Sequence, residues 1–132
     1  MIYIQSNIGG RKENQDFYDS AQTKFGVLII VCDGMGGHNG GRHAAERAVQ
    51  IIIEEVTKSI DINPAKTLQG AILKANEAIW QESSTNASLK GIVSTVLALL
   101  ITPERAICCH VGDSRIYQLR NCNEIIYTFK NK

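Results

Sequence analysis

The chain of 132 residues has little proline, few aromatic residues and no large excess of charge of either sign. Its 14 Lys and Arg residues nearly balance its 13 Asp and Glu residues, which leaves a formal net charge of +1. This balance disfavours nucleic acid as a partner, because proteins that bind it carry clustered basic residues. The longest apolar run, residues 92–101, is interrupted by Ser94 and Thr95 and is shorter than a membrane-spanning helix. These absences argue against nucleic-acid and membrane partners.

The N-terminus and the cysteines give no sign of secretion or of a zinc site. Residues 1–11 have neither the basic start nor the apolar core of a signal peptide, which predicts a cytoplasmic protein. The four cysteines form no C-x-x-C pair, and Cys32 lies in an apolar run, so we interpret them as structural thiols. Cys109 and Arg115 have the spacing of a tyrosine-phosphatase loop. We reject that alternative, because the residues after Arg115 alternate like a strand and Asp113 would repel a phosphate.

The chain length predicts a single domain over residues 1–132, with two helices in the middle of the sequence. Apolar residues three and four apart predict a first helix over residues 45–56. Asn63 can cap the start of a second helix, Pro64 suits its first position, and residues 83–88 end it. Since strands precede and follow the two helices, the fold class is predicted to be α+β, with a helical layer on a sheet.

Strands are predicted on both sides of the helices. The continuous apolar run of residues 25–32 indicates a strand covered on both faces, which stops at Asp33. Residues 112–114 are expected to form a hairpin turn, and residues 121–123 another turn. The remaining predicted strands are residues 2–8, 17–21, 93–101, 105–111, 115–119 and 125–129.

Three aspartates stand beside predicted strand ends: Asp16, Asp33 and Asp113. A charged side chain at such a position has to face water or an ion. Hard cations such as Mg²⁺ and Mn²⁺ prefer oxygen ligands, usually a few carboxylates and waters. The alternative is that each aspartate simply stabilises a turn, because aspartate side chains readily bond their own backbone. The choice between the two depends on the residues around them.

Two neighbouring segments favour chemistry on a phosphate. Arg11 precedes Asp16, and a guanidinium binds a phosphate dianion through paired hydrogen bonds, although a solvated charge cluster has the same spacing. A glycine-rich loop, residues 34–41, follows Asp33 and opens a helix, whose N-terminal amides favour anions. His38 in this loop is a candidate proton donor to a leaving group, or else a solvent-facing histidine.

Together, four segments resemble the metal-dependent protein phosphatases of the 2C type in their bacterial form. They are Arg11 with Asn14-Gln15-Asp16, Val31 to His38, Ser94-Thr95-Val96 and His110 to Arg115. Their order and spacing match from Ile4 to Thr128. The resemblance implies an α-β-β-α sandwich with two antiparallel sheets and a two-metal centre of Mn²⁺ or Mg²⁺. It also implies hydrolysis of phosphoserine and phosphothreonine in proteins, with the products of a serine/threonine kinase as substrates.

The resemblance assigns metal-binding roles to four residues. Asp33 would bridge the two metals, and Gly34 would offer its backbone carbonyl to one of them. Asp16 matches the acidic end of the first motif, which organises metal-bound water. Asp113 would serve a third, more weakly held metal ion.

The resemblance also assigns two residues to the substrate: Arg11 would bind the phosphate, and His38 would act as the acid. Family members continue through Ser-Asp-Gly and Asp-Asn motifs that this sequence does not contain, so the chain is predicted to be an N-terminal part of the domain. Missing carboxylates would weaken metal binding and missing strands would leave sheet edges unpaired. Two alternatives therefore stay open. The chain is either an inactive fragment that binds phosphoproteins or regulates, or a piece that needs its other half.

Overall fold

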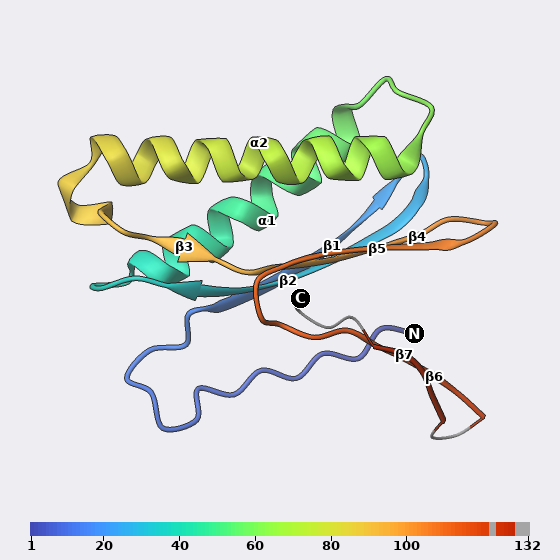
Figure 1. The fold of residues 1–132 in the computed structure, drawn as a ribbon, viewed down its shortest axis with the longest axis horizontal. Helices are drawn as coiled ribbons and strands as arrows, with labels where there is room; N and C mark the ends of the chain where they lie inside the picture. Colours follow the sequence, from blue (N-terminus) through green and yellow to red (C-terminus); the bar gives the residue numbers. More distant parts are fainter. Residues whose placement is uncertain (122–123, 129–132) are drawn as a thin grey trace.

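The computed structural model of the chain describes residues 1–121 and 124–128, and it shows two helices lying across one face of an antiparallel sheet (Figure 1). The N-terminal segment and a small hairpin lie on the other side of that sheet (Figure 1). The elements are β1 (Asp16–Thr23), β2 (Gly26–Met35), α1 (Gly40–Lys58), α2 (Pro64–Thr85), the 3-10 helix η1 (Ala87–Leu89), β3 (Val93–Ser94), β4 (Val96–Ile101), β5 (Ala106–Val111), β6 (Tyr117–Arg120) and β7 (Glu124–Thr128).

The strands that the structure describes form two antiparallel sheets. The larger sheet has the order β1-β2-β4-β5, with β3 paired to the end of β2, and the smaller sheet is the β6–β7 pair. Because the strands of the larger sheet are split between the two ends of the sequence and the helices lie between them, the predicted α+β class is confirmed. Of the described residues, only those of α1 and α2 provide a helical layer, and it covers one face.

The core lies between the helices and this face of the sheet. Alternate residues of β2, namely Leu28, Ile30 and Cys32, are fully buried, because successive side chains of a strand point to opposite faces. They pack with the apolar stripe of α1, which includes Ile52. The predicted coverage of β2 on both faces is wrong, since Val31 on the other face is 43% exposed.

Both helices confirm the patterns that predicted them. Asn63 accepts a hydrogen bond from the Lys66 amide at 3.1 Å through its side chain, and Pro64 opens α2. This cap satisfies one of the amides that a helix N-terminus leaves without a partner inside the helix. Helix α1 buries its three alanines and most of its branched residues. No described helix is long and apolar enough to cross a membrane.

Three strand predictions are wrong in ways that tertiary structure explains. Residues 2–8 form no strand, and Ile2 and Ile4 stay 49% and 43% exposed. A strand needs a neighbour to pair with, and none of the described strands pairs with this segment. The predicted strand at residues 93–101 is divided at Thr95 into β3 and β4. Strand β2 continues two residues past Asp33, where it pairs with β3.

The hairpin predicted around residues 112–114 is also wrong. Strand β5 pairs with β4 and strand β6 pairs with β7, so residues 112–116 connect the two sheets. The second predicted turn begins at Asn121, which has a φ of 51°, and its other residues, Cys122 and Asn123, lie outside the described residues. Strand β7 confirms the predicted last strand up to Thr128, and Phe129 lies outside the described residues.

The described cysteines are unpaired thiols in the structure. Burial raises the pKa of Cys32 to about 12, and burial followed by the neighbouring Cys108 raises the pKa of Cys109. A raised pKa keeps a thiol protonated and weakly nucleophilic at neutral pH. This agrees with the rejection of a cysteine-based phosphatase mechanism.

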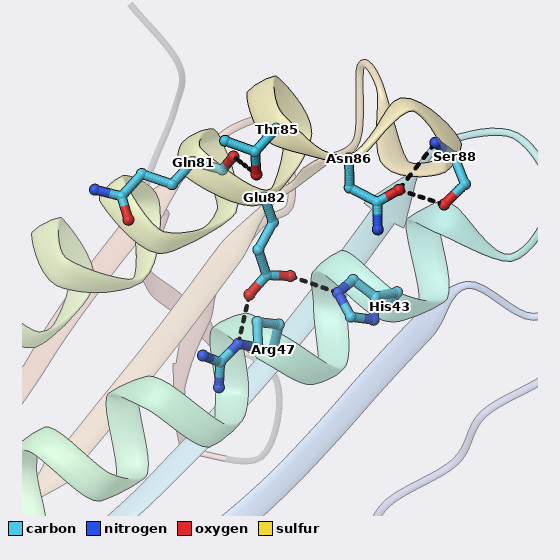
Figure 2. A network of polar contacts seen from close by, with 7 residues as sticks. All are labelled: His43, Arg47, Gln81, Glu82, Thr85, Asn86 and Ser88. Carbon is cyan, nitrogen blue, oxygen red and sulfur yellow. Dashed lines mark hydrogen bonds and ion pairs between the residues drawn. The ribbon is translucent and has the colours of Figure 1, made fainter.

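A network of charged side chains joins α1 to α2 at the helix ends nearest the glycine-rich loop (Figure 2). Glu82 of α2 accepts from Arg47 Nε at 2.8 Å and contacts His43 Nε2 at 2.6 Å, both on α1. Partial burial favours the neutral form of Glu82, but the hydrogen bonds and charges of His43 and Arg47 outweigh it and lower its pKa. Ionised Glu82 therefore joins α2 to α1 through its contacts with His43 and Arg47.

We expect Glu82→Gln to lower the free energy of unfolding by about 1 kcal/mol at pH 7. A carboxyl group whose pKa is lower in the folded state stabilises above its ordinary pKa, here 4.5, and this stabilisation is lost as the pH falls through the folded-state pKa. The difference between the two chains should therefore shrink in acid. Urea unfolding from pH 7 to below pH 4 measures it. Glu54→Gln, which removes a solvent-exposed 3.6 Å pair with Lys58, is the control and should have little effect. If the difference in free energy of unfolding between Glu82→Gln and the unchanged chain does not vary with pH, ionised Glu82 does not supply the stabilisation.

Candidate functional site

An open cleft of about 820 Å³ lies at the end of the sheet where β1 begins and β2 ends. The N-terminal segment, the glycine-rich loop, β3 and the connection after β5 all contribute to its walls. All six site residues predicted from the sequence line this one cleft: Arg11, Asp16, Asp33, Gly34, His38 and Asp113. Segments separated by about a hundred residues in the sequence are thus brought together, as the resemblance requires.

Asp16 and Asp33 form the centre of the cleft. They lie directly opposite each other in the register of β1 and β2, and each strand contributes one carboxyl group to the cleft. Partial burial, then the charge and hydrogen bond of Asp16, then the charge of Asp113 raise the pKa of Asp33. The positive charge of Arg11 opposes this shift. The carboxylates of Asp16 and Asp113 therefore add negative charge around Asp33, and the Arg11 guanidinium partly offsets it.

The donor atoms of this centre suit a hard divalent cation. Two adjacent carboxylates repel each other, and a cation between them would relieve the repulsion that raises the pKa of Asp33. Carboxylate oxygens are ligands that Mg²⁺ and Mn²⁺ prefer. Among the described residues, no group of three or more His, Cys, Asp or Glu side chains is close enough to hold a metal ion. The centre is thus a pair of carboxylates with Asp113 acting on Asp33 from farther away.

Close backbone contact fixes the glycine-rich loop beside Asp33. A Cβ atom on Gly34 would overlap the carbonyl oxygen of Gly41, so only glycine allows the end of β2 to meet the start of α1. Gln15 tightens the same contact, because its side chain donates to the Gly36 carbonyl at 2.9 Å and its own carbonyl accepts from the Gly34 amide at 3.1 Å. His38 lies farther along the loop with a φ of 46° and is exposed in the cleft.

Asp16 is held by residues for which the sequence indicated no role. Strand β1 is at the edge of the sheet, and both backbone groups of Asp16 are bound by side chains. The Asp16 amide donates to Asn14 Oδ1 at 3.0 Å, and its carbonyl accepts from Arg42 Nη1 at 2.7 Å. The Arg42 guanidinium also lies 4.8 Å from the centre of the Phe17 ring. Asn14 belongs to a segment that carried the resemblance, whereas nothing in the sequence pointed to Arg42.

We expect Asp16→Asn to stabilise the metal-free chain at neutral pH. Because the folded state raises the pKa of Asp33 above its ordinary 3.8, it binds a proton more tightly than the unfolded state, and stability falls as the pH rises through that window. Removing the charge of Asp16 should reduce this loss. Urea unfolding in the presence of a chelator, from pH 3 to pH 7, measures it. Asp19→Asn, on the same strand but outside the cleft, is the matched control. If Asp16→Asn is less stable than the unchanged chain at pH 7, repulsion between Asp16 and Asp33 does not destabilise the folded chain.

The sequence matches a family model described as protein phosphatase 2C over residues 5–131. The serine/threonine phosphatase stp of Listeria monocytogenes is 35% identical over 98 residues, which cover 71% of this chain and 39% of that protein. The protein phosphatase PhpP of Streptococcus pneumoniae is 32% identical over 123 residues, which cover 90% of this chain and 50% of that protein. The chain thus spans half or less of the length of these relatives.

Solved structures show the same likeness. The Mycobacterium tuberculosis serine/threonine phosphatase PstP/Ppp superposes with a TM-score of 0.74 at 28% identity, covering 89% of this chain and 48% of that one. A crystal structure of the PstP catalytic domain in complex with 2 manganese ions gives the same TM-score and identity, covering 87% and 48%. With the family match extending over nearly all of the sequence, the chain belongs to the protein phosphatase 2C family.

Proposed function

We propose that this chain is the part of a protein serine/threonine phosphatase that carries Asp16, Asp33 and Arg11, and that it acts in the metal-dependent hydrolysis of phosphoserine and phosphothreonine in proteins. Its substrates would be products of a serine/threonine kinase. The observation that carries the proposal is the pairing of Asp16 with Asp33 in the cleft that also contains Arg11. Membership of the family and the serine/threonine phosphatases among the relatives support it.

The proposal includes a centre of two Mn²⁺ or Mg²⁺ ions and a third, weaker site. Asp33 would bridge the two ions, the Gly34 carbonyl and Asp16 would complete their surroundings from this chain, and Asp113 would serve the third. When bound, such ions supply positive charge that lowers the pKa of a water molecule and neutralises the phosphate. The solved relative with 2 manganese ions supports the choice of metal.

Two residues would act on the substrate directly. Arg11 is exposed in the cleft, where its guanidinium can bind two phosphate oxygens and hold the ester beside Asp33. His38 is exposed in the same cleft and would give its proton to the serine or threonine oxygen as the P–O bond breaks. The products are inorganic phosphate and the free hydroxyl group. No covalent bond between enzyme and phosphate is needed.

A second candidate function is a phosphoprotein-binding module without turnover. It is favoured by the absence, among the described residues, of any group of three or more side chains able to hold a metal ion. Arg11 and the glycine-rich loop would then retain affinity for a phosphorylated side chain.

Hydrolysis of a phosphothreonine peptide by the purified full chain, with and without Mn²⁺, tests the proposal. We expect turnover that needs Mn²⁺ and falls at least about 100-fold in Asp33→Asn, because the bridging carboxylate is lost. Asp19→Asn should keep the activity of the unchanged chain. Metal-independent turnover, or turnover unaffected by Asp33→Asn, would overturn the mechanism. No turnover at any Mn²⁺ concentration, with retained binding of the phosphopeptide, would establish the second candidate.

A further inference from the structure

We propose that Thr95 is a positioning residue that sets the placement of Asp33 relative to Asp113, through one hydroxyl group shared with the Asp33 backbone and the Ser114 side chain. This inference deepens the proposed function and rests on it for the meaning of the two carboxylates. Thr95 lies in the cleft wall, between β3 and β4, and contributes no charge to the site.

The first observation is that the sheet is interrupted at Thr95. Pairing on either side, Gly34 with Ser94 and Val31 with Leu97, keeps the same register, so Thr95 stands opposite Asp33. The Thr95 amide donates to the Asp33 carbonyl at 2.9 Å, as in a regular antiparallel pair. The Asp33 amide, however, donates to Thr95 Oγ1 at 3.0 Å. A side-chain hydroxyl thus replaces the backbone carbonyl as the partner of Asp33.

The displaced carbonyl explains why the interruption is stable. The Thr95 carbonyl accepts from Ser94 Oγ at 2.8 Å, so no polar group of this pair loses its partner. One of the two hydrogen bonds between the Asp33 and Thr95 backbone segments is therefore made by the threonine side chain.

The second observation is that the same side chain holds the segment carrying Asp113. Thr95 Oγ1 lies 2.9 Å from Ser114 Oγ. The Thr95 methyl group packs against Gly112, where a Cβ atom would come within 2.7 Å of Thr95 Cγ2. Gly112 has a φ of 94°, a conformation that favours glycine. Asp113 therefore lies between two residues that both contact Thr95.

These contacts are compatible with a single hydroxyl group. A threonine hydroxyl has one proton to donate and two lone pairs that accept, so it can accept from Asp33 and still bond Ser114 in either direction. Valine at this position would keep the methyl contact and remove both hydrogen bonds. Serine would keep both hydrogen bonds and remove the methyl contact. The two replacements therefore separate the hydroxyl group from the packing.

The chain also offers a matched control at the opposite end of β4. Thr102 Oγ1 donates to the Arg105 carbonyl at 2.9 Å and accepts from the Arg105 amide at 3.1 Å. Thr102→Val thus removes two hydrogen bonds from a threonine hydroxyl, as Thr95→Val does, but does so far from the cleft-lining residues. A loss of stability alone would affect both variants alike.

Binding of Mn²⁺ alone to the full chain, followed by the electron paramagnetic resonance signal of the free ion, tests the inference. We expect Thr95→Val and Ser114→Ala each to weaken Mn²⁺ binding by about 10- to 100-fold, the range for partners that orient metal ligands. Thr95→Ser and Thr102→Val should bind as the unchanged chain does. Ser114→Ala leaves the Asp33 amide paired, so it serves if Thr95→Val does not fold. Unchanged Mn²⁺ binding in Ser114→Ala would overturn the inference.

Amide NMR spectra of the metal-free chain separate this inference from the proposed function. Thr95→Val should shift the amide signals of both Asp33 and Asp113, whereas Thr102→Val should shift neither. A shift confined to Asp33 would overturn the link to Asp113, whether or not the chain binds Mn²⁺. Conversely, Mn²⁺ binding that follows the expected order without any hydrolysis would refute the proposed function and support the positioning role of Thr95.

Discussion

Repulsion between two carboxylates at the ends of neighbouring strands is the constraint around which this cleft is organised. Asp16 and Asp33 are directly opposite each other, and the charge of Asp16 is the largest cause after burial that raises the pKa of Asp33. The fold keeps them together because the core behind them is apolar and closely packed, with Leu28, Ile30 and Cys32 fully buried under the helices. The stability of this core offsets the repulsion between Asp16 and Asp33. Groups with shifted pKa values of this kind are common at functional sites.

Neutral and cationic groups, rather than further carboxylates, hold the two aspartates in place. Arg42 and Asn14 bind both backbone groups of Asp16 at the sheet edge, and Thr95 does the same for Asp33 on the other side of β2. The close approach of Gly34 and Gly41 then brings the start of α1 against the same point. These partners bind the backbone groups of Asp16 and Asp33 and not their carboxyl oxygens. The two carboxylates therefore stay available to a ligand.

The sequence and the structure agree best where local pattern and burial coincide. The apolar stripes of α1 and α2, the Asn63 cap and the run of β2 were all predicted, since each is determined by neighbours in the sequence. They differ where strand pairing determines the structure. Residues 2–8 alternate like a strand, but none of the described strands pairs with them. Residues 112–116 connect two sheets although their composition suits a hairpin. Alternation of apolar and polar residues predicts which side chains share a face of a strand. It does not predict whether a second strand is present to pair with it.

The sequence by itself determined the family and the helices and pointed to six of the residues that line the cleft, because glycine, aspartate and arginine at these spacings restrict both backbone conformation and chemistry. Only the tertiary structure decided which groups orient those residues. Arg42 and Thr95 act through hydrogen bonds to residues 26 and 62 positions away, and no local pattern records such contacts. Long-range hydrogen bonds follow from the packing of the helices on the sheet and the register of its strands, which exist only once the chain has folded.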